Sequence, residues 1–279
     1  MRLLASKDMK IFSNGDLINK QSLGEVFEPG FLFGWGVYEP FRTYNCNIPF
    51  LTEHIERLNN SLETIGIEKV TLDWSKTIED LLIENNLKDA YVRITAYKKR
   101  KGTGVLIYAD KFGYYKPEVY NKGFSSVVSP YRRNPEDITS QVKSLSYLNN
   151  RLSWFSAQKV KKDEALVLNT EGGLAGGARS SIFLVKENKI ITPTSSCGGF
   201  SSITAKAVRK IAQYLSLTFK EEKVKMEDIY SSDEVFLTSA LLEIMPLVEC
   251  EQRPIGSGEP GSVTGKILEE YRKLLEKPC

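Results

Sequence analysis

The feature that most limits the possible folds is the alternation of strand-like and helix-like segments along the chain. Runs rich in β-branched and aromatic residues predict strands near 9–13, 35–44, 90–98 and 104–110. Between them, apolar residues at helical spacing predict helices near 52–65 and 72–86. Two helices laid on a sheet place this part of the chain in the α/β (α+β) fold class.

The C-terminal part follows a strand near 124–130 and the turn-rich "PYRRNPEDITSQ". A helix near 146–162 leads into the strand "EALVLNT", a glycine-rich stretch and a hairpin whose tip spans 187–189. The remaining segments predict a helix in "SSITAKAVRKIAQYLS", strands in "EVFLTSALLEIMPLVECEQRPIG" and an amphipathic helix in "TGKILEEYRKLLEK", with Ile267, Tyr271, Leu274 and Leu275 on its apolar face. We therefore expect an N-terminal α/β domain over 1–115, a strand and interdomain link over 116–134, and a C-terminal domain over 135–279.

Composition and charge exclude several classes of protein. With 279 residues and 41% hydrophobic content, the chain can bury a substantial core. A net charge of +3 on a chain that is 26% charged gives no footprint for nucleic acid or an anionic membrane, and the basic run at 98–104 is interpreted as a solvated hairpin. No run approaches the roughly 20 apolar residues of a membrane-spanning helix, and the N-terminus lacks the core of a secretory signal. We expect a soluble protein without nucleic-acid or membrane partners.

The cysteines and the histidine restrict the chemistry further. The four cysteines are Cys46, Cys197, Cys250 and Cys279. They lie far apart without a CxxC pair, so we expect reduced thiols in the cytoplasm and neither a zinc site nor a disulfide framework. A single histidine excludes a histidine-rich metal site. His54, in "FLTEHIERLNNSLETIGI", is interpreted as an ordinary residue of a helix that Thr52 caps.

Three short motifs could carry chemistry, and each is a weak signal by itself. The stretch "EGGLAGGARSSIF" (171–183) puts four glycines before a strand, which indicates a bend, a close approach to the backbone or a phosphate loop. In "GGFSSIT" (198–204), small and hydroxyl residues begin a helix, where capping is favoured over anion binding. Lys143, in "QVKSLSYLNNRL", is interpreted as a solvated amine unless burial lowers its pKa enough to make it a nucleophile.

Taken together, these segments resemble the class IV aminotransferases, which are the fold-type IV pyridoxal-phosphate enzymes. The segments "FGWGVYEPFRTYN", "HIERLNNS", "AYVRITAY", "QVKSLSYLNN", "EGGLAGGARSSIFLV", "GGFSSITAKAVRKIA" and "SALLEIMPLVE" follow one another in the family's order and at its spacing. The resemblance implies a two-domain fold, with a smaller N-terminal domain of a sheet with helices and a larger, barrel-like C-terminal domain that binds the cofactor. It also implies pyridoxal 5′-phosphate (PLP) as cofactor, an amino acid and a 2-oxo acid as substrates, and a homodimer.

The same resemblance implies roles for residues that hold the cofactor. Lys143 stands where the family has the lysine that bonds covalently to PLP and moves the proton at the substrate Cα. Arg57 matches an arginine that grips the cofactor phosphate, which suits a fork-shaped guanidinium. Ile203 and Thr204 match a pair at a helix start that binds this phosphate from the other side, and Tyr147 matches a tyrosine that bonds the phenolic oxygen.

On the substrate side, Arg93 in "YVR" resembles an arginine that meets a substrate carboxylate in some members of the family. Tyr38 and Pro40 fall on a strand that lines the family's pocket. Tyr38 and Arg93 are therefore predicted to contact the substrate.

The sequence departs from the family at the glycine-rich stretch. The family's version resembles D-G-x-V-T-E-G-S-x-S-N-I-F, so Ala175 replaces a threonine, Gly176 a glutamate and Ser181 an asparagine. In the family that glutamate keeps the pyridine nitrogen of PLP protonated, and the protonated ring stabilises the negative charge formed at Cα. With Gly176, water, a serine hydroxyl or Arg179 would meet the nitrogen. This predicts a poor transaminase that a Gly176→Glu substitution should improve. The competing outcome is that the glycine-rich backbone occupies the space of the lost carboxylate, so that the new side chain clashes and destabilises the protein.

Two further departures keep alternative functions open. Ser239 and Ala240 match positions beside the cofactor phosphate, and Ala240 replaces a threonine that helps to hold this phosphate in aminotransferases. The segment "SALLEIMP" looks closer to the corresponding segment of aminodeoxychorismate lyases. Trp35 replaces the aspartate or small residue common in "FGDG". The hypotheses are an aminotransferase for a branched-chain-like or D-amino acid with a degenerate ring-nitrogen site, a lyase of the aminodeoxychorismate type, and a catalytically impaired or repurposed member of the family. The retained Lys143 argues against the last.

Overall fold

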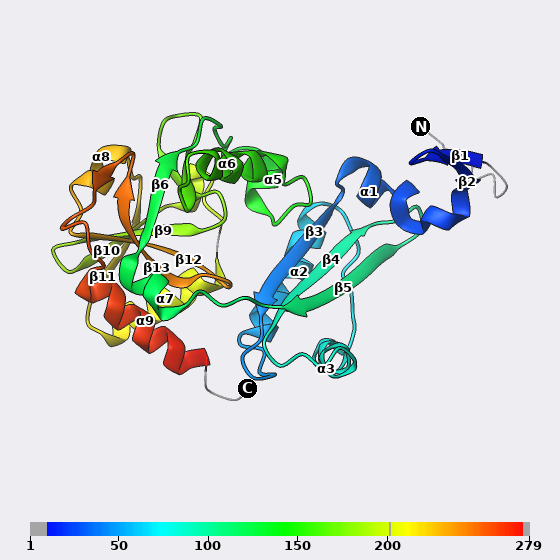
Figure 1. Cartoon of the computed structure of the whole chain (residues 1–279), viewed down its shortest axis with the longest axis horizontal. Helices are drawn as coiled ribbons and strands as arrows, with labels where there is room; N and C mark the ends of the chain where they lie inside the picture. The colour runs from blue at the N-terminus through cyan, green and yellow to red at the C-terminus, as the bar shows by residue number, and fades with distance from the viewer. Residues whose placement is uncertain (1–9, 201, 276–279) are drawn as a thin grey trace.

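The computed structural model of the protein describes residues 10–200 and 202–275. Over these residues the strands form a two-stranded, a three-stranded and a nine-stranded sheet. Figure 1 shows the chain divided between the three-stranded sheet with its helices and the larger, curled sheet. The mixed α/β fold class, with a small sheet unit and a larger barrel-like one, is therefore confirmed.

The smaller unit is an antiparallel sheet covered by two helices. Its strands β3 (Gly36–Arg42), β4 (Ala90–Lys98) and β5 (Thr103–Lys111) pair in that order, and α2 (Leu51–Thr64) and α3 (Trp74–Glu84) pack on one face. Burial alternates along β4, as expected for a sheet with one face against a core. The helices supply the other half of that core with Leu58, Leu62 and Ile78. The strands predicted near 35–44, 90–98 and 104–110 and both predicted helices are confirmed.

The elements before β3 were only partly foreseen. They are β1 (Lys10–Ser13), β2 (Asp16–Asn19), the 3₁₀ segment η1 (Lys20–Phe27) and α1 (Pro29–Phe33). The strand predicted near 9–13 agrees with β1, although residue 9 lies outside the described residues. The short elements β2, η1 and α1 had no counterpart among the predictions.

The larger unit is a mixed sheet in the order β11-β10-β9-β12-β13-β6-β7-β8, with β14 paired to β13. Its strands are β6 (Phe124–Val128), β7 (Glu164–Leu168), β8 (Leu174–Gly177), β9 (Ser181–Lys186), β10 (Lys189–Pro193), β11 (Thr218–Glu222), β12 (Glu234–Ser239), β13 (Glu243–Cys250) and β14 (Arg253–Pro254). Glu187 and Asn188, both with positive φ, make the tight turn between β9 and β10, so the predicted hairpin tip is confirmed.

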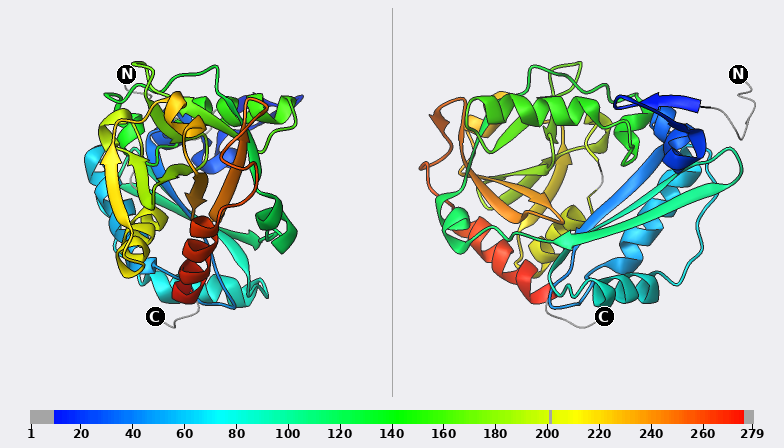
Figure 2. Two further views of the ribbon diagram at one scale, coloured as in Figure 1. Left: turned by 90° about the vertical axis from the view of Figure 1, so that its left-hand side faces the viewer. Right: turned by 45° about the vertical axis from the view of Figure 1, so that its right-hand side comes forward.

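Helices surround this curled sheet, as the two views of Figure 2 show. They are α4 (Pro117–Lys122), α5 (Ile138–Gln141), α6 (Leu148–Lys159), η2 (Ser195–Cys197), α7 (Ile203–Tyr214), α8 (Met226–Tyr230) and α9 (Ser262–Leu275). Phe183 and Phe236 stack with ring centroids 5.0 Å apart, and α7 and α9 close the core around them. The predicted apolar face of α9 is confirmed, since Ile267, Tyr271 and Leu275 are buried and Leu274 packs at the edge.

One predicted cap is wrong, and the cysteines are free thiols. Phe50, in the left-handed conformation with φ of 60°, is the N-cap of α2, whereas Thr52 lies inside the helix. Phe50 stacks on Tyr271, with ring centroids 6.4 Å apart, so a tertiary contact holds the residue at the start of the helix. Cys46, Cys197 and Cys250 are free, and Cys279 lies outside the described residues. Over 10–200 and 202–275 there is no helix of the length and apolarity that crossing a bilayer requires.

Candidate active site

Lys143 lies on a segment that attaches the larger unit to the edge of β3. Tyr38 N donates to Lys143 O at 2.9 Å, and Leu145 N donates to Gly36 O at 2.9 Å, so residues 143–145 extend the small sheet. The Lys143 amine lies over two aromatic rings, with Nζ 5.4 Å from the centroid of Tyr38 and 5.0 Å from that of Phe200. The lysine predicted from the motif therefore sits between the two units.

The surroundings of Lys143 weaken the charged form of its amine. Burial, together with the charges of Arg57, Arg93 and Arg133, lowers the pKa of Lys143 to about 8, although the charge of Glu39 opposes this shift. An amine with that pKa has a substantial unprotonated fraction near neutral pH. Only this unprotonated form acts as a nucleophile or accepts a proton. Burial thus lowers the pKa of Lys143 as a nucleophilic amine requires.

Arg57 is held by a buried carboxylate that the sequence interpretation missed. Nε of Arg57 donates to Glu39 Oε1 and Oε2 at 3.1 and 3.0 Å, and Nη2 donates to Oε1 at 2.6 Å. His54 lies on α2 as predicted, but its Nδ1 is 3.3 Å from Glu39 Oε2, a contact that the sequence did not indicate. The guanidinium also lies over Phe200, with Cζ 5.1 Å from the ring centroid. Phe200 thus contacts both Arg57 and Lys143.

Two tyrosines form the aromatic side of the site. Tyr38 and Tyr147 meet edge to face with centroids 5.5 Å apart, and Arg93 Cζ lies 3.9 Å from the Tyr38 centroid. The hydroxyl of Tyr147 donates to Ala178 O at 3.0 Å, and burial raises the pKa of both tyrosines. The residues predicted on the substrate side, Tyr38 and Arg93, therefore contact each other and lie beside Lys143.

The loop before α7 connects these groups to the glycine-rich stretch. Arg133 Nη1 donates to Gly198 O at 3.1 Å, and a Cβ on Gly199 would lie 3.2 Å from Ala175 O. Burial lowers the pKa of Arg133, which the sequence interpretation also missed. The sequence has two adjacent arginines, Arg132 and Arg133, and gives no sign of which one is buried.

The start of α7 and the turn after β12 are each closed by a serine side chain. Ser202 caps α7 by accepting from Ala205 N at 3.4 Å, and Ile203 and Thr204 are buried. Ser239 accepts from Leu241 N and Leu242 N at 3.3 and 3.1 Å, which closes the turn that carries Ala240. Roles for these residues in phosphate binding stay predictions, although an N-terminal turn of a helix is a suitable anion site.

At the glycine-rich stretch, the backbone disfavours the substitution that the sequence suggested. Gly176 has φ of +135°, and a Cβ there would lie 3.1 Å from Ser180 O. A glutamate at 176 would therefore be strained, which favours the competing outcome, a destabilising clash, over restoration of the lost carboxylate. Gly177 is also crowded, since a Cβ there would meet the side chains of Ser180 and Glu164, whereas Gly172 allows a positive φ of 87° in the turn between β7 and β8.

Neither Arg179 nor Glu164 takes the place of the missing carboxylate in the described contacts. Arg179 Nη2 donates to Asp163 O at 3.2 Å, and its guanidinium lies over Trp154 at 4.2 Å. Glu164 accepts from Ala165 N and the Ser180 hydroxyl, both at 3.0 Å, and burial raises its pKa. Together the two side chains are thus engaged by Trp154 on α6 and by residues in or next to β7 and β9.

The donor set fits an aldehyde that carries a phosphate. Lys143 offers an amine of low pKa for the aldehyde, while Arg57 and the first turn of α7 offer hydrogen-bond donors for the phosphate. Position 176 offers no side chain, so the pyridine nitrogen of PLP would lack the anion that the resemblance implies.

Comparison with known proteins agrees with this geometry. Residues 36–250 match the family model for the amino-transferases of class IV. The chain belongs to the class IV aminotransferases. These enzymes use PLP. The predicted family, and the enzyme class that it implies, are therefore confirmed.

Individual relatives cover almost the whole chain. A protein of Methanocaldococcus jannaschii named as a branched-chain-amino-acid aminotransferase is 32% identical, with 96% of this chain and 97% of the relative covered. An aminodeoxychorismate lyase of Bacillus subtilis is 30% identical over 95% of this chain and 94% of its own. The solved branched-chain aminotransferase of Thermoproteus uzoniensis with norvaline is 30% identical and superposes with a TM-score of 0.83, covering 96% and 95% of the two chains.

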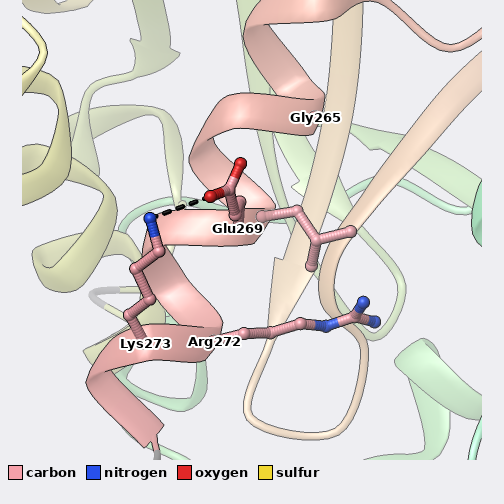
Figure 3. Close-up of a pocket in the computed structure, with 5 residues that line it drawn as sticks. Gly265, Glu269, Arg272 and Lys273 are labelled. Atoms are coloured by element: carbon pink, nitrogen blue, oxygen red, sulfur yellow. Dashed lines mark ion pairs between the residues drawn. The ribbon is translucent and has the colours of Figure 1, made fainter.

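A hollow on the surface lies along α9, apart from these residues. Its volume is about 380 Å³, and it is lined by Gly265, Leu268, Glu269, Arg272 and Lys273. Figure 3 shows Glu269 and Lys273 paired across one turn of the helix, at 2.8 Å. None of the residues that line it contacts Lys143 or Arg57 in the described contacts, so the hollow is not part of the candidate active site.

Proposed function

We propose that this protein is an aminotransferase that moves an amino group between an amino acid and a 2-oxo acid, with PLP held on Lys143. The observation that carries the proposal is the Lys143 amine, whose pKa of about 8 and position beside Tyr38, Phe200 and Arg57 suit a nucleophile next to an anion site. PLP, when bound, supplies the electron sink for the charge left at the substrate Cα.

The residues of the chain have separate tasks in this proposal. Lys143, as the free amine, accepts the proton from the substrate Cα and returns it. Arg57 and the start of α7 bind the phosphate. Tyr147 bonds the phenolic oxygen of PLP, and Arg93, held over Tyr38, binds the substrate carboxylate. The rings of Tyr38 and Phe200 exclude water from the amine.

The substrate proposed is a branched-chain-like or a D-amino acid. Support comes from the aromatic walls of the site and from relatives named as branched-chain or D-alanine aminotransferases, such as that of Bacillus licheniformis, 29% identical over 93% of this chain. Because position 176 lacks a carboxylate, we expect turnover below about 1 s⁻¹, the low end of ordinary enzyme rates.

The test is the half-reaction of the PLP-loaded protein with a panel of L- and D-amino acids. Loss of the visible band, together with an equivalent amount of 2-oxo acid, is the expected result for at least one amino acid. A PLP-loaded protein that releases no 2-oxo acid from any of them would contradict the proposal and favour a repurposed member of the family.

A lyase of the aminodeoxychorismate type is the second candidate. It is favoured by the hydroxyl-free Ala240 in the turn after β12 and by the 30% identical lyase of Bacillus subtilis. A lyase turns over without a 2-oxo acid acceptor, whereas an aminotransferase stops after one half-reaction. Multiple turnovers without acceptor would therefore decide for the lyase.

We further infer a cytoplasmic homodimer. α6 exposes Leu148, Leu152 and Phe155 by 70%, 36% and 51%, and their spacing places them on one face of the helix. An apolar stripe of this kind suits a second copy of the chain, and the three free thiols suit a reducing compartment. Sedimentation analysis should give a dimer that Leu148→Glu weakens. A monomeric wild type would contradict the inferred dimer. Fractionation of cells should place the protein with cytoplasmic markers.

A further inference from the structure

Glu39 is a buried carboxylate in the middle of an apolar strand. Its side chain is 1% exposed, against 16% for that of Arg57. A buried charge costs several kcal/mol unless it is paired and hydrogen-bonded, so a carboxylate here requires its partners. Arg57 supplies three of its contacts, and His54 supplies a fourth.

The secondary structure brings these three side chains together. His54 and Arg57 are three residues apart on α2, which places them on the same side of the helix. β3 turns Glu39 toward α2 together with Val37 and Phe41, and the ring of Phe41 lies 4.9 Å from that of His54. Tyr38, on the other side of the strand, points to Lys143 and Arg93.

The charge states of the group follow from its contacts. Burial alone would raise the pKa of Glu39, but the hydrogen bond of His54 and the charge of Arg57 outweigh it and hold that pKa below its ordinary value. Burial lowers the pKa of His54, with Arg57 and Lys143 acting in the same direction and Glu39 opposing them. Near neutral pH, a neutral His54 therefore donates from Nδ1 to an ionised Glu39.

We propose that Glu39 is a positioning residue for phosphate binding. Its carboxylate engages Nε and Nη2 of Arg57 and so fixes the plane of the guanidinium beside Phe200, and His54 fixes the carboxylate in turn. The inference rests on the proposed function, because the phosphate concerned is that of PLP. In this proposal the phosphate is recognised by the orientation of the Arg57 guanidinium, because the charges of Arg57 and Glu39 cancel.

If Glu39 orients Arg57, its removal should change PLP affinity in the opposite direction from the change expected if Glu39 only neutralises the charge of Arg57. If Glu39 only cancelled the charge of Arg57, its removal would increase the attraction for a phosphate dianion. If Glu39 orients the guanidinium, its removal lets the side chain rotate and weakens phosphate binding. Removal of a partner that orients a metal ligand typically weakens binding by about 10- to 100-fold, and we expect a loss of that order for Glu39→Gln.

The experiment compares PLP with pyridoxal, the same aldehyde without the phosphate. Wild type, Glu39→Gln and His54→Gln are titrated with each, and the visible band of the adduct with Lys143 gives the dissociation constant. We expect Glu39→Gln to weaken PLP binding about tenfold or more without weakening pyridoxal binding, because loss of the Glu39 charge only lowers the pKa of Lys143. His54→Gln should have a smaller effect of the same kind. The matched control is Glu234→Gln, because Glu234 accepts from Val263 N and Thr264 N at the start of α9 and should change neither constant.

The comparison within one variant protein separates positioning from folding. Equal weakening of PLP and pyridoxal would show a general distortion and would overturn the inference, as would tighter or unchanged PLP binding in Glu39→Gln. A wild type that forms no adduct with either aldehyde would contradict the proposed function as well. Failure of the inference alone leaves both wild-type adducts intact.

Discussion

Lys143 shows how the residues around a side chain decide its chemistry. Its motif predicted the position, but the lowered pKa depends on burial, on Arg57 and Arg93, which lie far from it in the sequence, and on Arg133. Of these arginines, only Arg57 and Arg93 could be singled out from the sequence, through the resemblance. A buried charge such as Arg133 becomes recognisable only when its neighbours are known.

The pH dependence of Lys143 follows from this environment. The folded pKa of about 8 lies below that of an ordinary lysine, about 10.4. Between these values the unfolded chain binds more protons, so this residue makes the free energy of unfolding rise with pH over that window. Competitive acetylation followed by peptide mass spectrometry should show Lys143 titrating near 8. A Lys143 midpoint that matches those of the exposed lysines would refute the assignment.

Gly176 gives a second prediction at this scale. Gly176→Glu and Gly176→Ala should both lower the free energy of unfolding by about 1–3 kcal/mol, because φ of +135° suits only glycine and the new Cβ meets Ser180 O. Urea unfolding measures the loss. Gly113→Ala is the control, since its Cβ would meet nothing within 4 Å. A Gly176→Glu protein as stable as the wild type would show that the bend can accept a side chain.

At the scale of elements, regular periodicity was the reliable signal. β4, β5 and α2 were predicted closely because their apolar residues recur at the strand or helix period over many residues. Short elements such as α1 and α8 have too few residues to show a period. Glu39 was missed for a related reason, since a charged residue inside an apolar strand gives no periodic signal of its partners.

The first turn of α7 allows capping to be separated from phosphate binding. Ser202→Ala should lower the free energy of unfolding by about 1 kcal/mol, because Ala205 N loses its acceptor. Ser202→Asp should retain that stability, since aspartate caps equally well, but its charge should weaken PLP binding at the helix start. Paired unfolding and PLP titrations test this. Undiminished PLP affinity in Ser202→Asp would remove α7 from the phosphate site.

At the scale of the whole molecule, a buried ionic cluster joins the two units. Glu243 on β13 pairs with Arg42 on β3 and with Arg272 on α9, and it accepts from the Tyr44 hydroxyl at 3.2 Å. Arg42 also lies over the rings of Tyr44 and Tyr114. No sequence pattern links Glu243 to Arg42, which lies 201 positions before it. The domain link placed at 116–134 stays a prediction.

Glu243 should therefore be a major determinant of stability. Glu243→Ala leaves the buried Arg42 without its counter-ion and should lower the free energy of unfolding by about 3–5 kcal/mol. Arg272→Met is the matched control, because that side chain is 44% exposed and its pair should contribute no more than about 1 kcal/mol. Chemical denaturation measures both. A loss in Glu243→Ala no larger than that in the control would contradict the role given to the cluster.

The most direct test of the account is to identify the residue that carries the cofactor. The protein is incubated with PLP, reduced with borohydride, digested and mapped by mass spectrometry, with Lys143→Ala treated in parallel. We expect a phosphopyridoxyl group on the peptide that contains Lys143 in the wild type and on no peptide of the variant. A label on another lysine, or an unlabelled wild type, would contradict the central claim that Lys143 is the covalent anchor.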